Sequence, residues 1–190
     1  MADHHDLRSP GGSLDVMPTL VRDPQPVEFE RLLELRRQLG QDLLDEVWEG
    51  VHHMNPAPAG RHADIAQQLA ELLGAPARKA GLVPMLSIFN LGEADNYRVP
   101  DGGLHRDREN RVYYPTVAMA VEIVSPEDET WDKLSFYASR RVDELLIVDP
   151  QERRVHWLGL GPDGEYRPLE VSGLIELGAA ELADRIDWPE

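Results

Sequence analysis

Residues 117–124 read VAMAVEIV, a run in which a single carboxylate, Glu122, interrupts seven apolar side chains. So short and so apolar a run predicts a strand that is buried on both faces of a sheet. A carboxylate is seldom buried without a partner, because taking its charge out of water is costly. Glu122 is therefore either a metal ligand or one half of a structural ion pair.

The segments on either side of this run alternate between helical and extended patterns. Apolar residues at helical spacing, with Pro and Gly at the boundaries, predict helices at residues 26–39, 61–73, 127–141 and 179–184. Branched and aromatic runs predict strands at 47–54, 82–91, 97–104, 116–124 and 145–148, and an edge hairpin at 153–160 with 165–171. The second helix is expected to stop at Gly74 and Pro76. This order predicts an α/β fold, a mixed central sheet flanked by helices.

Length and composition indicate one globular domain. The chain has 190 residues, of which 42% are hydrophobic and 28% charged, enough for a single core. Residues 1–25 are rich in Pro, Gly and Asp without a sustained period, so we expect a flexible arm there and a single domain over 26–190. The absence of cysteine excludes disulfides and thiolate metal sites. No signal peptide or membrane span is visible, and a cytoplasmic protein is expected.

The charge balance disfavours non-specific DNA binding. The sequence holds 19 basic and 35 acidic residues, and 19 − 35 = −16. A negative surface repels a phosphate backbone, although it also serves solubility with no partner at all. A nuclease of this composition needs its basic residues on one face. The candidates are Arg78, Lys79, Arg98, Arg106, Arg108 and Arg111.

Three residues suggest metal-dependent chemistry. Asp101 follows Pro100 near one predicted strand, Glu122 lies within the next, and Lys133 is one of only two lysines in the chain. Two carboxylates at strand ends can hold Mg²⁺, and an amine beside them can neutralise charge that develops on a phosphate. Each residue also has a structural interpretation, since Pro-Asp-Gly-Gly favours a turn and a lysine on a solvated helix face usually has no special role.

Several segments, taken together and in order, resemble the Uma-two family of restriction-endonuclease-like proteins, a bacterial branch of the PD-(D/E)XK nuclease superfamily. The segments are 97–101 (YRVPD), 120–126 (AVEIVSP), 132–137 (DKLSFY) and 144–150 (ELLIVDP), with further likeness at 46–50 and at His62. The resemblance covers residues 27–175. It implies a restriction-endonuclease-like α/β core, a divalent cation such as Mg²⁺ or Mn²⁺, and hydrolysis of phosphodiester bonds in nucleic acid, with DNA as the expected substrate.

The resemblance also implies roles for individual residues. Asp101 and Glu122 would be the metal carboxylates, the backbone carbonyl of Ile123 a third ligand, and Lys133 the superfamily lysine. That lysine usually stands two residues after the acidic one, where this chain has Val124. The amine must therefore come from the following helix, as is typical of the Uma branch.

Two further residues are secondary candidates under the same resemblance. Glu46 would reach the metal through water, or would be an exposed glutamate at a helix end. His62 would contact phosphate or polarise a ligand, or would only cap its helix. The loop before Lys133 is about three residues shorter than is common in the family and carries Glu127, Asp128 and Glu129 in place of a basic cluster.

Other classes of function stay open from the sequence. A catalytically degenerate member would keep the fold as a binding or regulatory module. A structural homodimer could form through the edge hairpin or the N-terminal arm. A basic partner protein could deliver nucleic acid to an acidic nuclease.

Overall fold

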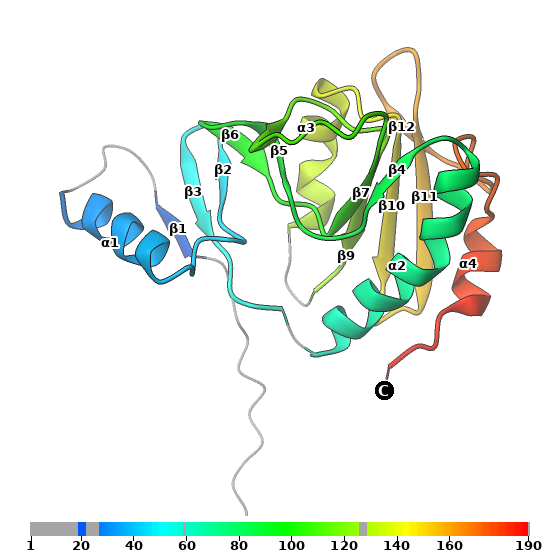
Figure 1. The fold of residues 1–190 in the computed structure, drawn as a ribbon, viewed down its shortest axis with the longest axis horizontal. Coiled ribbons are helices and arrows are strands. Elements are labelled where there is room, and N and C mark those ends of the chain that lie inside the picture. The colour runs from blue at the N-terminus through cyan, green and yellow to red at the C-terminus, as the bar shows by residue number, and fades with distance from the viewer. Residues whose placement is uncertain (1–18, 22–26, 59, 126–128, 190) are drawn as a thin grey trace, which may run out of the picture.

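The computed structural model describes residues 19–21, 27–58, 60–125 and 129–189, and the strands within them form two six-stranded sheets (Figure 1). The first sheet has the order β1-β3-β2-β6-β5-β8. Its strands are β1 (Thr19–Val21), β2 (Glu46–Trp48), β3 (Val51–Met54), β5 (Asn90–Glu93), β6 (Asn96–Arg98) and β8 (Tyr113–Tyr114). The chain is thus an α/β protein as expected, with the strands divided between two sheets where we expected one central sheet.

The second sheet contains the central strands of the core. Its order is β12-β11-β10-β9-β7-β4, and β9 and β10 run parallel while the other neighbours are antiparallel. Its strands are β4 (Val83–Met85), β7 (Gly102–His105), β9 (Met119–Ile123), β10 (Glu144–Asp149), β11 (Arg154–Leu160) and β12 (Tyr166–Pro168). The edge hairpin predicted near the C-terminus is β11 and β12.

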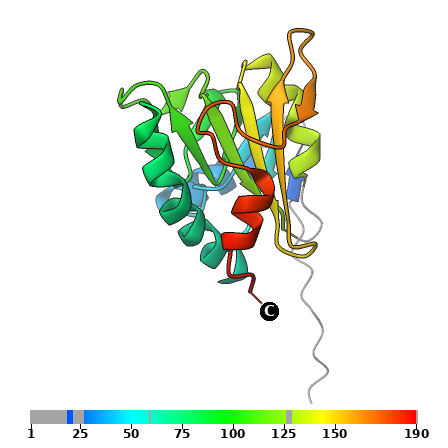
Figure 2. The same ribbon diagram turned by 90° about the vertical axis from the view of Figure 1, so that its right-hand side faces the viewer.

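Helices cover both faces of this second sheet. The helices of the described residues are α1 (Val27–Gln38), α2 (Gly60–Lys79), η1 (Thr130–Lys133), α3 (Leu134–Ser139) and α4 (Ala179–Arg185), of which η1 is a 3-10 turn that leads into α3. Helix α1 lies beside β1 and β3 of the first sheet (Figure 1). In Figure 2, α2 and α4 lie together in front of the sheet, whereas α3 lies on its other side. None of the described helices combines the length and the apolarity needed to cross a membrane.

Strand β9 is buried on both faces, as its apolar run predicts. Alternate residues of a strand point to opposite faces. Met119, Val121 and Ile123 pack in the cluster that contains the buried apolar residues of α2. Ala120 packs in the cluster that contains Phe136 of α3. Glu122 is two residues from Ala120 and points to the same face, so the strand directs its carboxylate towards α3.

The predicted strand at 47–54 is instead a tight hairpin. β2 and β3 pair antiparallel with Trp48 opposite Val51, and Glu49 and Gly50 between them have φ of 49° and 86°. Two consecutive residues with positive φ are typical of the type I′ turn that joins hairpin strands. Its weaker signal, Glu-Gly in place of Asn-Gly, is why the pattern suggested one continuous strand.

Two predicted helix boundaries were wrong. Helix α2 continues through Gly74 and Pro76 to Lys79, because Leu73 and Ala77 on either side are fully buried and their packing outweighs the hydrogen bond that proline removes. The helix predicted at 127–141 is shorter: η1 and α3 together span residues 130–139, and residues 127 and 128 lie outside the described residues.

The predicted strands at 82–91 and 97–104 each contribute to both sheets. β4 and β7 belong to the second sheet, whereas β5 and β6 belong to the first. The chain changes sheet at Val99–Asp101, which puts Asp101 immediately before β7. Of the arm predicted over residues 1–25, only β1 lies within the described residues, and its backbone pairs with β3.

Candidate active site

The site is built around Glu122, which is 4% exposed. Lys133 Nζ, from the end of η1, lies 3.2 Å from Glu122 Oε1 and 3.3 Å from Oε2. The Tyr137 hydroxyl of α3 donates to Oε1 of the same carboxylate. The buried carboxylate of β9 thus has a cation and a phenol as partners, both supplied by the segment that follows the strand.

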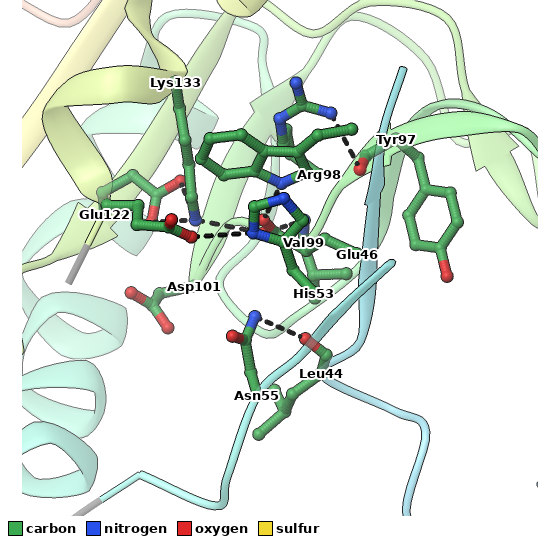
Figure 3. A network of polar contacts seen from close by, with 12 residues as sticks. Leu44, Glu46, His53, Asn55, Tyr97, Arg98, Val99, Asp101, Glu122 and Lys133 are labelled. Atoms are coloured by element: carbon green, nitrogen blue, oxygen red, sulfur yellow. Dashed lines mark hydrogen bonds and ion pairs between the residues drawn. The ribbon is translucent and has the colours of Figure 1, made fainter. Parts of the chain in front are cut away.

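Glu46, on β2 of the other sheet, is the second carboxylate of this network. Its Oε1 lies 3.0 Å from Lys133 Nζ and accepts the Val99 N–H at 2.7 Å, and its Oε2 accepts the Trp48 indole N–H at 2.7 Å. The side chain is 1% exposed, so the interpretation as an exposed glutamate at a helix end was wrong. Lys133 is shared between one carboxylate from each sheet, as Figure 3 shows.

These neighbours shift the pKa values of the two glutamates in opposite directions. Burial raises the pKa of Glu122 to about 8, and the nearby charges of Asp101 and Glu46 raise it too, against the opposing effects of Lys133 and Tyr137. Burial also disfavours the charged form of Glu46, but Lys133 and the Val99 and Trp48 hydrogen bonds lower its pKa overall. The pKa of Glu122 therefore lies above the ordinary glutamate value and that of Glu46 below it, so Glu122 takes up a proton at higher pH than Glu46.

Lys133 remains a cation in this environment. Burial opposes its charge, but Glu122 and Glu46 outweigh that effect and raise its pKa. The pKa of the Tyr137 hydroxyl is also raised, by burial first and by Glu122 second. Neither group is therefore suited to remove a proton from water near neutral pH. The chemistry available to Lys133 is that of a fixed positive charge and hydrogen-bond donor.

Asp101 lies near Glu122 in Figure 3 and immediately precedes the neighbouring strand, β7. Gly102 of β7 pairs with Val121 of β9, so Asp101 stands next to Glu122 in the register. Asp101 Oδ2 accepts the Ile123 N–H at 2.8 Å, and Asp101 Oδ1 lies 3.1 Å from His62 Nε2 in the first turn of α2. The side chains of His62 and Asp101 are 14% and 16% exposed, so solvent reaches the site from this side.

The residues present fit a hard divalent cation. Asp101 and Glu122 offer oxygen ligands from adjacent strands, and Mg²⁺ commonly binds one or two carboxylates and completes its shell with water and substrate phosphate. Within the described residues no group of three or more Asp, Glu, His or Cys side chains is already gathered as a metal site. The remaining ligands would thus be a backbone carbonyl such as that of Ile123, water and phosphate.

A stack of four planar groups fixes the first sheet against α3. The Arg98 guanidinium lies 4.2 Å from the Trp48 ring centroid and 4.1 Å from that of Phe136. His53 stacks on the other side of Trp48 at 4.2 Å and contacts Glu129 Oε2 through Nδ1 at 2.8 Å. Because Trp48 also hydrogen-bonds Glu46, the stack positions the carboxylate that holds Lys133.

The stack corrects one sequence prediction and adds residues that the sequence did not reveal. Arg98 was a candidate for a basic surface, but it is buried and its NH1 group donates to the carbonyls of Val47 and Tyr97. Two other arginines of the same candidate set form ion pairs with exposed carboxylates: Arg106 with Asp143, and Arg111 with Asp107 and Glu109. Tyr137 ends the resemblance segment 132–137 and His53 lies near the likeness at 46–50, but neither side chain was predicted to have a role. Two open depressions, of about 510 and 460 Å³, lie away from the site, around Phe89 and Glu144.

The structure thus brings Asp101, Glu122, Lys133, Glu46 and His62 into one network, with Ile123 joined through its N–H. Their catalytic and metal-binding roles stay predictions. Of the acidic loop before Lys133, only Glu129 lies within the described residues, and it contacts His53.

Comparisons with known proteins found a family match and a structural match. A family model described as "Uma2: Putative restriction endonuclease" matches residues 27–183. A crystal structure of a "putative nuclease belonging to DUF820" from Anabaena variabilis ATCC 29413 superposes with a TM-score of 0.61 at 16% sequence identity. The superposition covers 74% of this chain and 90% of that one, which shows a shared fold. No curated protein matches the sequence.

Proposed function

We propose, from the premise that this chain belongs to the Uma2 family of restriction-endonuclease-like proteins, that it is a divalent-metal-dependent endonuclease acting on nucleic acid, with DNA the expected substrate. Membership of the family supports a nuclease function. One observation carries the finer proposal: Lys133 Nζ lies 3.2 Å from Glu122 in a network that continues, one register position away, to Asp101. Two carboxylates and a permanent cation are the groups that hydrolysis of a phosphodiester requires.

Asp101 and Glu122 would hold Mg²⁺ or Mn²⁺, with the Ile123 carbonyl as a further ligand. When bound, such a cation supplies Lewis acidity towards phosphate and lowers the pKa of a coordinated water. Glu122 must give up its proton to act as a ligand, and the nearby Lys133 ammonium favours that ionisation. Glu46 stays ionised in either state and keeps Lys133 in place.

Lys133 would stabilise the reacting phosphate. Hydrolysis forms a bond from water oxygen to phosphorus and breaks one ester bond, so negative charge grows on the phosphoryl oxygens and on the leaving oxygen. An ammonium held by two carboxylates is already oriented and needs no reorganisation as that charge develops. His62, on the solvent side of Asp101, would contact the incoming phosphate or orient the Asp101 carboxylate.

Cleavage assays with single- and double-stranded DNA and RNA, in Mg²⁺ or Mn²⁺, test the proposal. Wild-type protein should cleave at least one substrate, and Glu122→Gln and Asp101→Asn should lose both metal binding and cleavage. The matched control is Glu181→Gln, the same chemical change on an exposed surface of α4, and it should behave as wild type. Equal cleavage by wild type and Glu122→Gln would identify a contaminating nuclease.

Substitution of Lys133 separates binding from chemistry. Lys133→Ala should leave the metal affinity nearly intact and reduce cleavage by roughly 10²- to 10³-fold, the usual cost of losing one donor to a developing charge. Lys133→Arg should not rescue, because a planar guanidinium does not fit the place of a compact ammonium between Glu46 and Glu122. If Lys133→Ala cleaves as well as wild type, the lysine is only a structural counter-ion.

One alternative has a specific observation in its favour. Lys133 is already satisfied by two carboxylates, and the chain has a net charge of −16, as a catalytically degenerate member used for binding or regulation would also have. Absence of cleavage by wild type on every substrate, with metal binding intact, would support that alternative. Cleavage that appears only with a basic partner protein would instead support delivery of the substrate by that partner.

A further inference from the structure

Trp131 is an exposed aromatic side chain next to the candidate site. It is 46% exposed, whereas Trp157 is buried and Trp48 and Trp188 are partly buried, and all four tryptophans of the chain lie within the described residues. One part of the Trp131 ring packs against His156 of β11, with centroids 5.2 Å apart and an interplanar angle of 86°. This edge contact orients the indole and leaves much of its surface open to solvent.

The sheet register places this tryptophan close to Glu122. Glu122 of β9 pairs with Ile147 of β10, and Ile147 pairs with His156 of β11. The three residues form one row across the sheet, and their side chains point to the face that α3 covers. Two strand spacings separate Glu122 from His156, roughly 10 Å. Trp131, which packs on His156, is therefore within a few nucleotides of a phosphate bound at Glu122.

A cation lies on the same face of the same strand. Arg154 precedes His156 by two residues in β11, so it points to the same side, and its side chain is 64% exposed. Its ion pair with Glu152 is 3.5 Å long between two exposed groups and is easily exchanged for another partner. Asp149, opposite Arg154 in the register, already accepts the N–H groups of Gln151 and Glu152.

A single exposed hydrophobic residue is ordinary on a protein surface. Trp131 differs from that case in three respects: its ring is held by His156, a basic side chain stands on the same face, and the row leads to the candidate active site. The neighbouring Asp132 is exposed and repels phosphate, so a strand would present a base, and not a phosphate, to Trp131 itself. The net charge of −16 likewise weakens binding that depends on phosphate contacts alone.

We propose that Trp131 is a stacking platform for an unpaired base of the nucleic-acid substrate, with Arg154 contacting an adjacent phosphate. In an intact duplex both faces of each base are covered by its neighbours, so an indole can stack only on a single-stranded, terminal or extruded base. The substrate class is therefore nucleic acid with unpaired nucleotides at the cleavage site, either DNA or RNA. This inference rests on the proposed function, because the nuclease site makes nucleic acid the expected ligand.

Binding measured without cleavage tests the inference. Fluorescence anisotropy in EDTA would compare labelled single-stranded DNA, single-stranded RNA and the matching duplex on wild-type protein, Trp131→Ala and Trp131→Phe. Single strands should bind more tightly than the duplex. Trp131→Ala should weaken single-strand binding by roughly 5- to 150-fold and duplex binding far less. Trp131→Phe should keep most of the affinity, since a phenyl ring still stacks.

Intrinsic fluorescence gives a readout that a merely structural tryptophan would not change. Single strands should quench the tryptophan emission of wild type, and Trp131→Phe should bind without that part of the quenching. Val112→Ala, a truncation of another exposed apolar residue beyond the site, is the matched control and should bind as wild type. Thermal melting of each variant confirms folding.

Three outcomes would overturn the inference: equal affinity for single strand and duplex, equal losses on both in Trp131→Ala, or unchanged single-strand binding in that variant. The outcomes are distinct from failure of the proposed function. If the protein binds single strands through Trp131 but cleaves no substrate, the stacking role stands and the nuclease function is wrong. If the Trp131→Ala variant cleaves as efficiently as wild type, the nuclease function stands and the stacking role of Trp131 is wrong.

Discussion

Glu122 and Glu144 lie on neighbouring parallel strands of the same sheet and are buried to nearly the same extent, 4% and 5% exposed. Their partners differ in kind. Glu144 accepts hydrogen bonds from the Trp157 indole, the Ser172 hydroxyl and the backbone N–H groups of Gly173 and Leu174. Glu122 has the Lys133 ammonium and the Tyr137 hydroxyl, with a second carboxylate beside it.

The comparison separates a structural carboxylate from a candidate catalytic one. Four neutral donors, two of them backbone groups, satisfy Glu144 and fasten the 172–174 loop to the sheet. A charge held in this way has nothing left to offer a ligand. Glu122 shares its cation with Glu46 and faces Asp101, so the charge of its ionised form is only partly compensated. A divalent cation would complete that compensation.

The largest expected effect is on stability, at Glu144. Glu144→Ala leaves several buried donors without an acceptor, and we expect a loss of about 3–5 kcal/mol in the free energy of unfolding by urea. Glu122→Gln should not destabilise the protein at pH 7, because a pKa raised to about 8 means that the fold disfavours the ionised carboxylate relative to a neutral group. A Glu144→Ala protein as stable as wild type would show that the loop does not depend on this carboxylate.

The second effect concerns pH. The folded-state pKa of Glu122, about 8, lies above the unfolded value of 4.5, so the native state binds the extra proton between these values. Its stability is therefore fully present below pH 4.5 and declines as pH rises through 8. In EDTA, wild type should lose on the order of 2–4 kcal/mol relative to Glu122→Gln across this window. If the difference in unfolding free energy between the two proteins does not change with pH, the folded-state pKa of Glu122 is not raised.

The smallest effect is that of metal on the fold. At ten times its dissociation constant, Mg²⁺ should stabilise the wild type by about 1.4 kcal/mol, seen as a rise in melting temperature. The rise should persist in Glu144→Gln and disappear in Asp101→Asn and Glu122→Gln. Because binding displaces the Glu122 proton, it should also grow from pH 6 to pH 8. A rise of the same size in Glu122→Gln would place the metal elsewhere.

The same pair shows the limit of prediction from sequence. Glu122 interrupts an apolar run and Glu144 opens one, Leu145–Val148, so each has the pattern of a costly buried charge. Their difference depends on η1, whose Lys133 is 11 residues from Glu122, and on the 172–174 loop, whose residues are 28 to 30 positions from Glu144. Periodicity does not encode such contacts. The ordered resemblance segments indicate Glu122 and Lys133, whereas the burial of Glu46 depends on the pairing of β2 with β6, which the sequence does not indicate.

The fold was more predictable than its division into sheets. Apolar runs located β9 and β10, and helical spacing located α1 and α2, because buried elements must present continuous apolar faces. The switch between sheets at Val99–Asp101 gave no signal of its own, since a Pro-Asp-Gly-Gly turn is equally compatible with a hairpin in one sheet. The planar stack around Arg98 was also not predicted, because an arginine is expected at the surface.

The shared lysine has a consequence for how the molecule folds. Lys133 and Glu46 are 87 residues apart in sequence, and Glu46 and Val99 are 53 apart. Closing such long loops costs entropy that only the completed docking of the two sheets repays. The ion network should therefore form among the last contacts on the folding path, after the local hairpins and helices. A partly folded chain would have the carboxylates and the amine but not their arrangement, and activity would report completion of the fold.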